Sequence, residues 1–119
     1  MAYFGDNAIH AWVCFNGGGA SNSTPSIRDD YNISSIGDVS TSTFTIFFDT
    51  DFANTDYAWS ASAGYDNYAQ QNWVSSPSST SYSNWKQTSV IKLIAVYANN
   101  TAPNRGPDDF NLIAMGDSA

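Results

Sequence analysis

The stretch HAWVCFNGGG, residues 10–19, contains the pattern that decides the fold of this chain. Its first six residues alternate along a strand, and both sets of alternating side chains are largely apolar. This pattern predicts a strand over residues 8–15 that is buried on both faces. An asparagine and three glycines follow immediately.

The glycine run at residues 17–19 allows two interpretations. A phosphate-binding loop would lead into a helix and carry a lysine, whereas here the sequence continues as ASNSTPS. The run therefore predicts a turn in which at least one residue needs a positive φ.

Short alternating segments recur along the rest of the chain, and each predicts a strand. Residues 26–31 and 31–36 form strands with a bend at Asp29-Asp30, and a turn follows at Gly37-Asp38. Strands are also expected at 43–48, 57–63, 88–97 and 110–116, with Phe110, Leu112 and Ala114 on one face of the last. Residues 64–85 are expected to form a long loop or a loose hairpin.

About seven short strands separated by turn residues, without a helical period, predict an all-β fold. We expect an antiparallel β-sandwich or a small jelly-roll-like barrel. Its 119 residues fit a single domain, 1–119, in which residues 1–7 form a short N-terminal leader.

Composition supports this fold class and restricts the partners. The net charge is −7, every acidic residue is aspartate, and only four residues are basic. Aspartate favours turns and caps rather than helix interiors. Four basic residues cannot neutralise many phosphates, and we therefore expect no nucleic-acid partner.

Cellular location is constrained by what the sequence lacks. No apolar run approaches the roughly 20 residues of a membrane span, so membrane insertion is not expected. The N-terminus has no secretory signal pattern, and the single cysteine, Cys14, excludes an internal disulfide. We expect Cys14 to pack as a small apolar residue.

The residues that could form a catalytic or metal-binding site each have a structural interpretation as well. His10, the only histidine, shares a predicted strand face with Cys14, but a structural role is favoured because no nucleophile motif accompanies either residue. Asp49 and Asp51 have the D-x-D spacing that holds a divalent cation in some carbohydrate-active enzymes, and they also suit a turn after a strand. A calcium site could draw on scattered aspartates, namely Asp29, Asp30, Asp56, Asp66, Asp108 and Asp109.

The aromatic tract at residues 57–85 predicts a contact surface. Aromatic rings stack on sugar faces, and the same mixture of Tyr, Trp, Ser and Asn serves protein–protein contacts. Tyr57 and Trp59 are expected in the core. Candidate contact residues in the tract are Tyr65, Tyr68, Trp73, Tyr82 and Trp85.

The order AWVCFNGGG, IRDDYNISSIGD and STFTIFFDTDFANTDYAWSASAG resembles a module of tailed-phage virion proteins, commonest in the distal parts of tail fibres. Cys14 stands where that module usually has asparagine, and the resemblance is weakest over residues 65–89. The matching residues are Ala11, Trp12, Val13, Phe15, Asn16, Gly17, Ile27, Arg28, Asn32, Ile33, Ser34, Ser35, Ile36, Asp38, Phe48, Thr50, Tyr57 and the final LIAMGD.

The resemblance implies an all-β, non-enzymatic protein on the outer surface of a phage particle, made in the host cytoplasm and very often trimeric. It implies no catalytic residue and no cofactor. It also implies that the glycines close the first hairpin and let the chain reverse between Phe15 and Ile27.

Because the module begins within about ten residues of Met1, no length is left for a fibre shaft. We therefore expect a homotrimeric capsid decoration, or cement, protein that binds the major capsid protein. The alternative is a short tail-fibre or receptor-binding tip, attached to a tail protein, that recognises a host glycan. A small enzyme using Asp49 and Asp51 is the least favoured interpretation.

Expected contact residues for the decoration role lie at the two ends of the chain. Tyr3 and Phe4 are large and apolar and precede the first strand, so they could dock on the shell or on a neighbouring subunit. Contacts between subunits are expected on the last strand, at Phe110 and Leu112.

Overall fold

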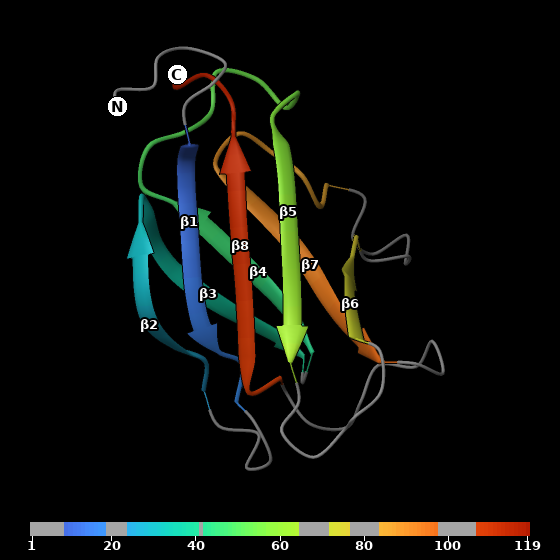
Figure 1. The fold of residues 1–119 in the computed structure, drawn as a ribbon. Coiled ribbons are helices and arrows are strands. Elements are labelled where there is room, and N and C mark those ends of the chain that lie inside the picture. Colours follow the sequence, from blue (N-terminus) through green and yellow to red (C-terminus); the bar gives the residue numbers. More distant parts are fainter. Residues whose placement is uncertain (1–8, 19–23, 41, 65–71, 77–83, 98–106) are drawn as a thin grey trace.

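The computed structural model describes residues 9–18, 24–40, 42–64, 72–76, 84–97 and 107–119, which form strands and loops without a helix (Figure 1). Within this part of the chain, no helix is therefore long and apolar enough to cross a membrane. The eight strands are β1 (Ile9–Asn16), β2 (Ser26–Tyr31), β3 (Ile33–Ser40), β4 (Thr43–Phe48), β5 (Ala58–Gly64), β6 (Asn72–Ser75), β7 (Val90–Tyr97) and β8 (Asp109–Met115).

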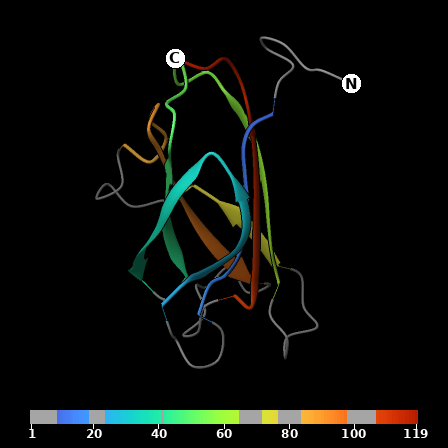
Figure 2. The ribbon, with the colours of Figure 1, turned by 90° about the vertical axis from the view of Figure 1, so that its left-hand side faces the viewer.

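The strands form two antiparallel sheets packed face to face (Figure 2). The first sheet has the order β2-β1-β8-β5, and the second has the order β3-β4-β7-β6. The predicted all-β sandwich is therefore confirmed, with one strand more than the sequence indicated. That strand, β6, lies in the tract expected to be a loop or a loose hairpin.

The inner faces of the two sheets form one hydrophobic core. Phe15 stacks on Phe110 with ring centroids 4.8 Å apart, and Phe44 of the opposite sheet meets both rings edge to face. Trp59 and Trp85 pack against this core and against each other, with ring centroids 5.9 Å apart. Each fully buried aromatic or aliphatic side chain contributes roughly 1.5–3 kcal/mol relative to an exposed one.

The chain passes from the first sheet to the second at Asn32, which separates β2 from β3. Asn32 has a φ of 59°, a left-handed conformation that asparagine tolerates better than most residues. Its side-chain amide donates to the carbonyl oxygens of His10 and Thr50, and its oxygen accepts from the Thr50 amide. The bend predicted at Asp29-Asp30 is therefore wrong, because this side chain stabilises the corner at Asn32 instead.

The turn predicted at Gly37-Asp38 is also wrong. Gly37 pairs with Thr45 and Asp38 with Phe44, so β3 continues through both residues before the chain reverses into β4. Pairing with the alternating strand β4 therefore outweighs the local preference of Gly37-Asp38 for a turn. The inward residues of β4, Phe44, Ile46 and Phe48, are buried.

Strands β1 and β2 pair as an antiparallel hairpin in which Phe15 lies opposite Ile27, and Gly17 and Gly18 follow β1. The Gly17 amide donates to the Pro107 carbonyl oxygen at 2.9 Å, and a Cβ on Gly17 would lie 2.7 Å from Pro107 Cγ. Gly18 has a φ of 105°, and its amide donates to Asn16 Oδ1 at 2.8 Å. Gly17 is therefore required by a close approach, and Gly18 has the positive φ that was predicted within the glycine run, whereas Gly19 lies outside the described residues.

Candidate functional site: the outer face of the first sheet

The strand that decided the fold has one covered face and one uncovered face. Ala11, Val13 and Phe15 are at most 1% exposed and point into the core. Trp12 and Cys14, on the other face, are only half-buried. The prediction that this strand is buried on both sides is therefore wrong for the described chain, which covers the inner face alone.

Cross-strand pairing places Trp12 in a row that spans the sheet. Trp12 lies opposite Tyr31 of β2 and Ile113 of β8, and Ile113 lies opposite Ser60 of β5. In the adjacent row, Ile9 lies opposite Met115, which faces Ala58. We call the large apolar members of these two rows the apolar face: Ile9, Trp12, Tyr31, Ile113 and Met115.

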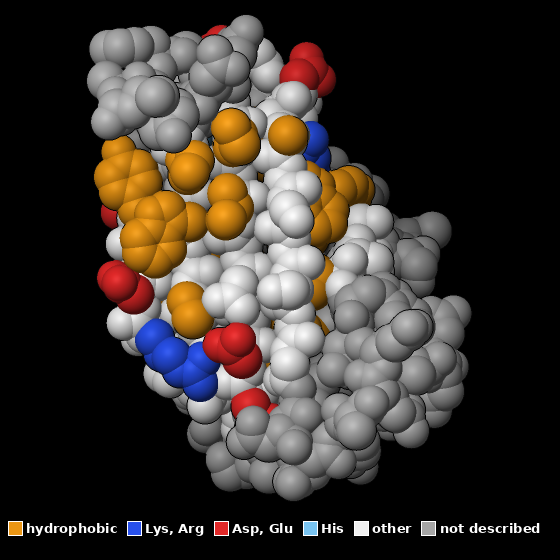
Figure 3. All heavy atoms as spheres, viewed as in Figure 1, with side chains coloured by type: hydrophobic (Ala, Val, Ile, Leu, Met, Phe, Trp, Pro, Cys, Tyr) orange, Lys and Arg blue, Asp and Glu red, His pale blue; other side chains and the backbone are white. Residues whose placement is uncertain are grey.

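The apolar face is exposed to an extent unusual for large hydrophobic residues. Tyr31 is 57% exposed, Ile113 48% and Ile9 44%. Figure 3 shows hydrophobic side chains gathered over β1, β2 and β8 at one end of the sheet. Contiguous apolar patches larger than a few hundred Å² mark contact sites on soluble proteins.

Small side chains beside the apolar face lower the surface along β5. Its outward residues are Ala58, Ser60 and Ser62, all exposed, and we call them the β5 strip. A hollow of about 150 Å³ lies among Ala58, Ser60, Ile113 and Met115, and a second of about 140 Å³ extends from Ser60 and Ser62 to Asn111. The face therefore has a raised half over β2 and β1 and a lowered half along β5.

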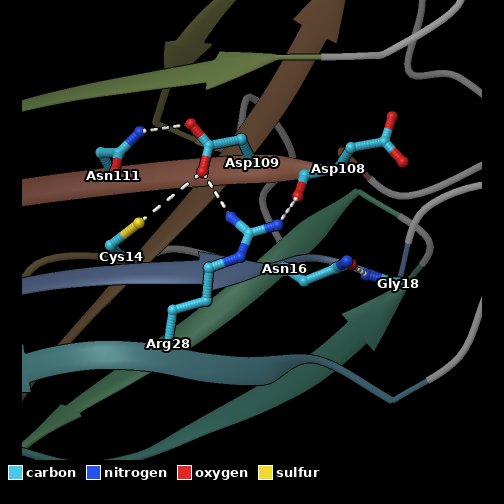
Figure 4. A network of polar contacts seen from close by, with 7 residues as sticks. All are labelled: Cys14, Asn16, Gly18, Arg28, Asp108, Asp109 and Asn111. Carbon is cyan, nitrogen blue, oxygen red and sulfur yellow. Dashed lines mark hydrogen bonds and ion pairs between the residues drawn. The ribbon is translucent and has the colours of Figure 1, made fainter.

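The opposite end of the same face is polar (Figure 4). Arg28 forms an ion pair with Asp109 and donates a second hydrogen bond to the Asp108 carbonyl oxygen at 2.7 Å. Asp109 also accepts from Cys14 Sγ at 3.6 Å and from the Asn111 side chain at 3.0 Å. Cys14 is thus part of a polar group on the outer surface rather than the apolar packing residue that was predicted.

The residues predicted as subunit contacts on the last strand belong to the core. Phe110 is 0% exposed and Leu112 is 1% exposed, because the inward face of β8 carries them. The outward face of the same strand carries Ile113 and Met115 instead. Sequence reasoning chose the more hydrophobic set of side chains on this strand, and that is the set that faces the core.

The aromatic tract is only partly described. Trp85 is half-buried against the core rather than presented to a partner, and Trp73 lies in β6. Tyr57 is buried and Trp59 packs against the core, which confirms the role predicted for them. Other predicted contact residues lie outside the described residues, namely Tyr3, Phe4, Tyr65, Tyr68 and Tyr82.

His10 lies at the apolar end of the sandwich, where it joins three segments of the chain. Its Nε2 donates to the Thr50 carbonyl oxygen at 2.8 Å, and in the neutral ring its Nδ1 therefore accepts from Ser118 Oγ at 3.0 Å. The ring is 6% exposed and packs 4.0 Å from the Phe52 ring, measured between centroids. These contacts agree with the predicted structural role, and the conceivable partner Cys14 takes no part in them.

A cleft of about 630 Å³ opens beside His10, lined among others by Tyr31, Asn32, Asp117 and Ser118. Ser118, His10 and the Thr50 carbonyl have the order nucleophile, base and orienting acceptor found in acyl-transfer sites. Such a site also needs amides that point at the developing oxyanion. The Ala119 amide, next to Ser118, instead donates to the Asp51 carbonyl oxygen, so the arrangement is best explained as an anchor for the C-terminus.

Asp49 and Asp51 are both exposed in the segment between β4 and β5. Within the described residues, no group of three or more His, Cys or Asp side chains is arranged to hold a metal ion. Asp66, which the calcium interpretation included, lies outside that part of the chain.

Comparison of the chain with protein-family models, curated proteins and solved structures returned no match. The apolar face is therefore the feature on which a functional proposal has to rest. Its one signal in the sequence was that both faces of β1 are apolar.

Proposed function

We propose that this chain is a non-enzymatic structural protein of a tailed-phage virion that decorates the exterior of the head and stabilises it. The observation that carries the proposal is the apolar face. A sandwich that leaves a second hydrophobic surface uncovered on its own sheet is suited to contact another protein. Because the sequence resembles virion modules, we propose that this other protein belongs to a phage particle.

The chemistry of the surface suits a protein that assembles after synthesis. The net charge of −7 favours solubility before assembly, while the five residues of the apolar face carry no charge. Contact partners in this proposal are copies of the chain and the major capsid protein. Docking of Tyr3 and Phe4 on the shell remains a prediction, and the homotrimer implied by the resemblance is an untested alternative to a twofold contact between two copies.

A receptor-binding tip is the second candidate, and the cleft beside His10 is the observation that favours it. Tyr31 offers a 57% exposed ring at its rim, and Asp117, Ser118 and Thr50 bring polar groups to its walls. An aromatic ring beside carboxylate and hydroxyl groups is a suitable surface for a sugar. Asp117→Ala would then weaken adsorption to host cells, whereas a decoration protein would tolerate this substitution.

The test is to locate the protein on purified virions with an antibody and to measure its binding to heads that lack it. We expect label over the heads, saturable binding of the purified chain, and weaker binding of Ile113→Ser. Ser35→Arg, on the exposed part of β3 in the second sheet, is the control and should bind normally. Label confined to the tail tip would favour the second candidate, and absence of label from particles would contradict both.

A further inference from the structure

We propose that a second copy of this chain covers the apolar face, through a twofold contact in which the two first sheets stack face to face. This inference deepens the proposed function, because it names a partner for the surface on which that function rests. The shape, charge and size of the apolar face support a second copy as its partner.

The shape of the face is self-complementary. The row Tyr31, Trp12, Ile113, Ser60 crosses the sheet from its bulkiest side chains to its smallest. The hollow beside Ser60 measures about 150 Å³, close to the volume of a cavity that accommodates a benzene ring. A ring such as that of Tyr31 therefore matches the lowered half of the same face on another molecule.

The sheet order defines the symmetry that brings these halves together. In the order β2-β1-β8-β5, the centre of the sheet lies between β1 and β8. A twofold axis parallel to the strands at that point places β2 of one copy over β5 of the other. Tyr31 then meets Ser60 of the second copy and Trp12 meets Ile113, at the separation of about 10 Å typical of stacked sheets.

The distribution of charge favours the same axis. The apolar face and the β5 strip contain no charged side chain, whereas Asp109, paired with Arg28, begins β8 at the end of the sheet opposite Met115. An axis along the strands keeps the apolar end of each copy against the apolar end of its partner. It therefore leaves carboxylates out of the centre of a contact between two chains of charge −7.

The size of the face favours an extended, flat partner. A stable interface takes about 800 Å² from each side, so a contact of that size would extend from the apolar face over the neighbouring strand. The β5 strip has to be covered as well, and a second first sheet covers both at once. A ring of three copies is less suitable, because the raised and lowered halves lie on one sheet and point in the same direction.

The experiment measures the mass of the isolated chain by sedimentation over a range of concentrations. We expect a monomer–dimer equilibrium in the wild-type protein. Ser60→Arg should raise the dissociation constant roughly 100-fold or more, because it fills the hollow and buries an unpaired charge. Tyr31→Ser should raise it roughly 10- to 100-fold, because a tyrosine ring that fills a hollow of the partner is a common hot spot of binding.

Ser35→Arg is the matched control, since it adds the same charge to an exposed serine of the second sheet, and it should dimerise like the wild type. Thermal unfolding of each variant at low concentration establishes that it folds. A monomer at all concentrations, a trimer, or a dimer unaffected by Ser60→Arg would overturn the twofold contact. These outcomes concern the isolated protein, so head binding still decides the proposed function separately.

Discussion

The two faces of the first sheet are built from the same strands and have opposite surroundings. On the inner face, Phe15, Phe110 and Leu112 are at most 1% exposed beneath the second sheet. On the outer face, Trp12, Ile113 and Met115 face away from the core, and Ile113 is almost half exposed. The side chains on both faces are hydrophobic, so hydrophobicity alone does not indicate which face is buried within the chain.

This difference means that an apolar strand face is not always covered by the chain that carries it. A continuous apolar run in a strand normally indicates cover on both sides. Here the second sheet supplies one cover, and we infer that another molecule supplies the other. Substitutions on the two faces of the sheet test this assignment.

Phe110→Ala should have the largest effect. It removes a ring that stacks on Phe15 in the core, so we expect the free energy of unfolding to fall by about 3–5 kcal/mol. Ile113→Ala, three residues along the same strand on the outer face, should change it by about 0.5 kcal/mol or less at concentrations where the protein is monomeric. Urea unfolding measures both, and equal losses would mean that the two faces are equally covered within one chain.

Gly17→Ala should destabilise by about 1–3 kcal/mol, because the new Cβ would lie 2.7 Å from Pro107 Cγ and 2.8 Å from Phe44 Cζ. Gly64, at the end of β5, is the control. A Cβ there would lie 3.8 Å from Asp109 Cβ, an ordinary contact, so Gly64→Ala should be nearly neutral. If thermal unfolding shows equal shifts for the two variants, close packing at Gly17 is not what requires the glycine.

Tyr57→Phe tests a polar group inside the covered region. The Tyr57 hydroxyl donates to the Gln87 carbonyl oxygen at 3.0 Å, and its loss should cost about 1 kcal/mol at neutral pH. Burial raises the pKa of this hydroxyl well above its usual value, so the folded protein retains a proton that the unfolded chain releases above about pH 10. The wild-type protein should therefore lose stability as the pH rises beyond 10. Unfolding curves at pH 8 and 10.5 should show a smaller loss in the variant.

Arg28→Ala should have the smallest effect, because its ion pair with Asp109 is about half exposed on the outer face. We expect a loss of roughly 1 kcal/mol or less at low salt, and less still at high salt, where the pair is screened. Chemical unfolding at two salt concentrations measures this. A loss that is large and independent of salt would indicate that the polar end of the face is buried in the folded monomer.

Much of the fold could be predicted from the sequence, because β4, β7 and β8 alternate with a period of two and glycines mark the first hairpin. The corner at Asn32 could not, since its hydrogen bonds to His10 and Thr50 join residues distant in the sequence. The Gly37-Asp38 pair was misleading because pairing with β4 outweighs its local preference for a turn. Which face of β8 is buried depends on which set of its side chains the second sheet covers, and a local pattern does not contain that information.

Hydroxyl-radical footprinting of the outer and inner faces tests directly whether another molecule covers the apolar face. In dilute isolated protein, Tyr31 and Met115 should be labelled, while Phe15 and Phe110 should not. In the assembled state, whether concentrated protein or purified particles, labelling of Tyr31 and Met115 should fall several-fold and that of an exposed control, Phe47, should not change. Equal labelling of Tyr31 and Met115 in both states would contradict the claim that another molecule covers the apolar face.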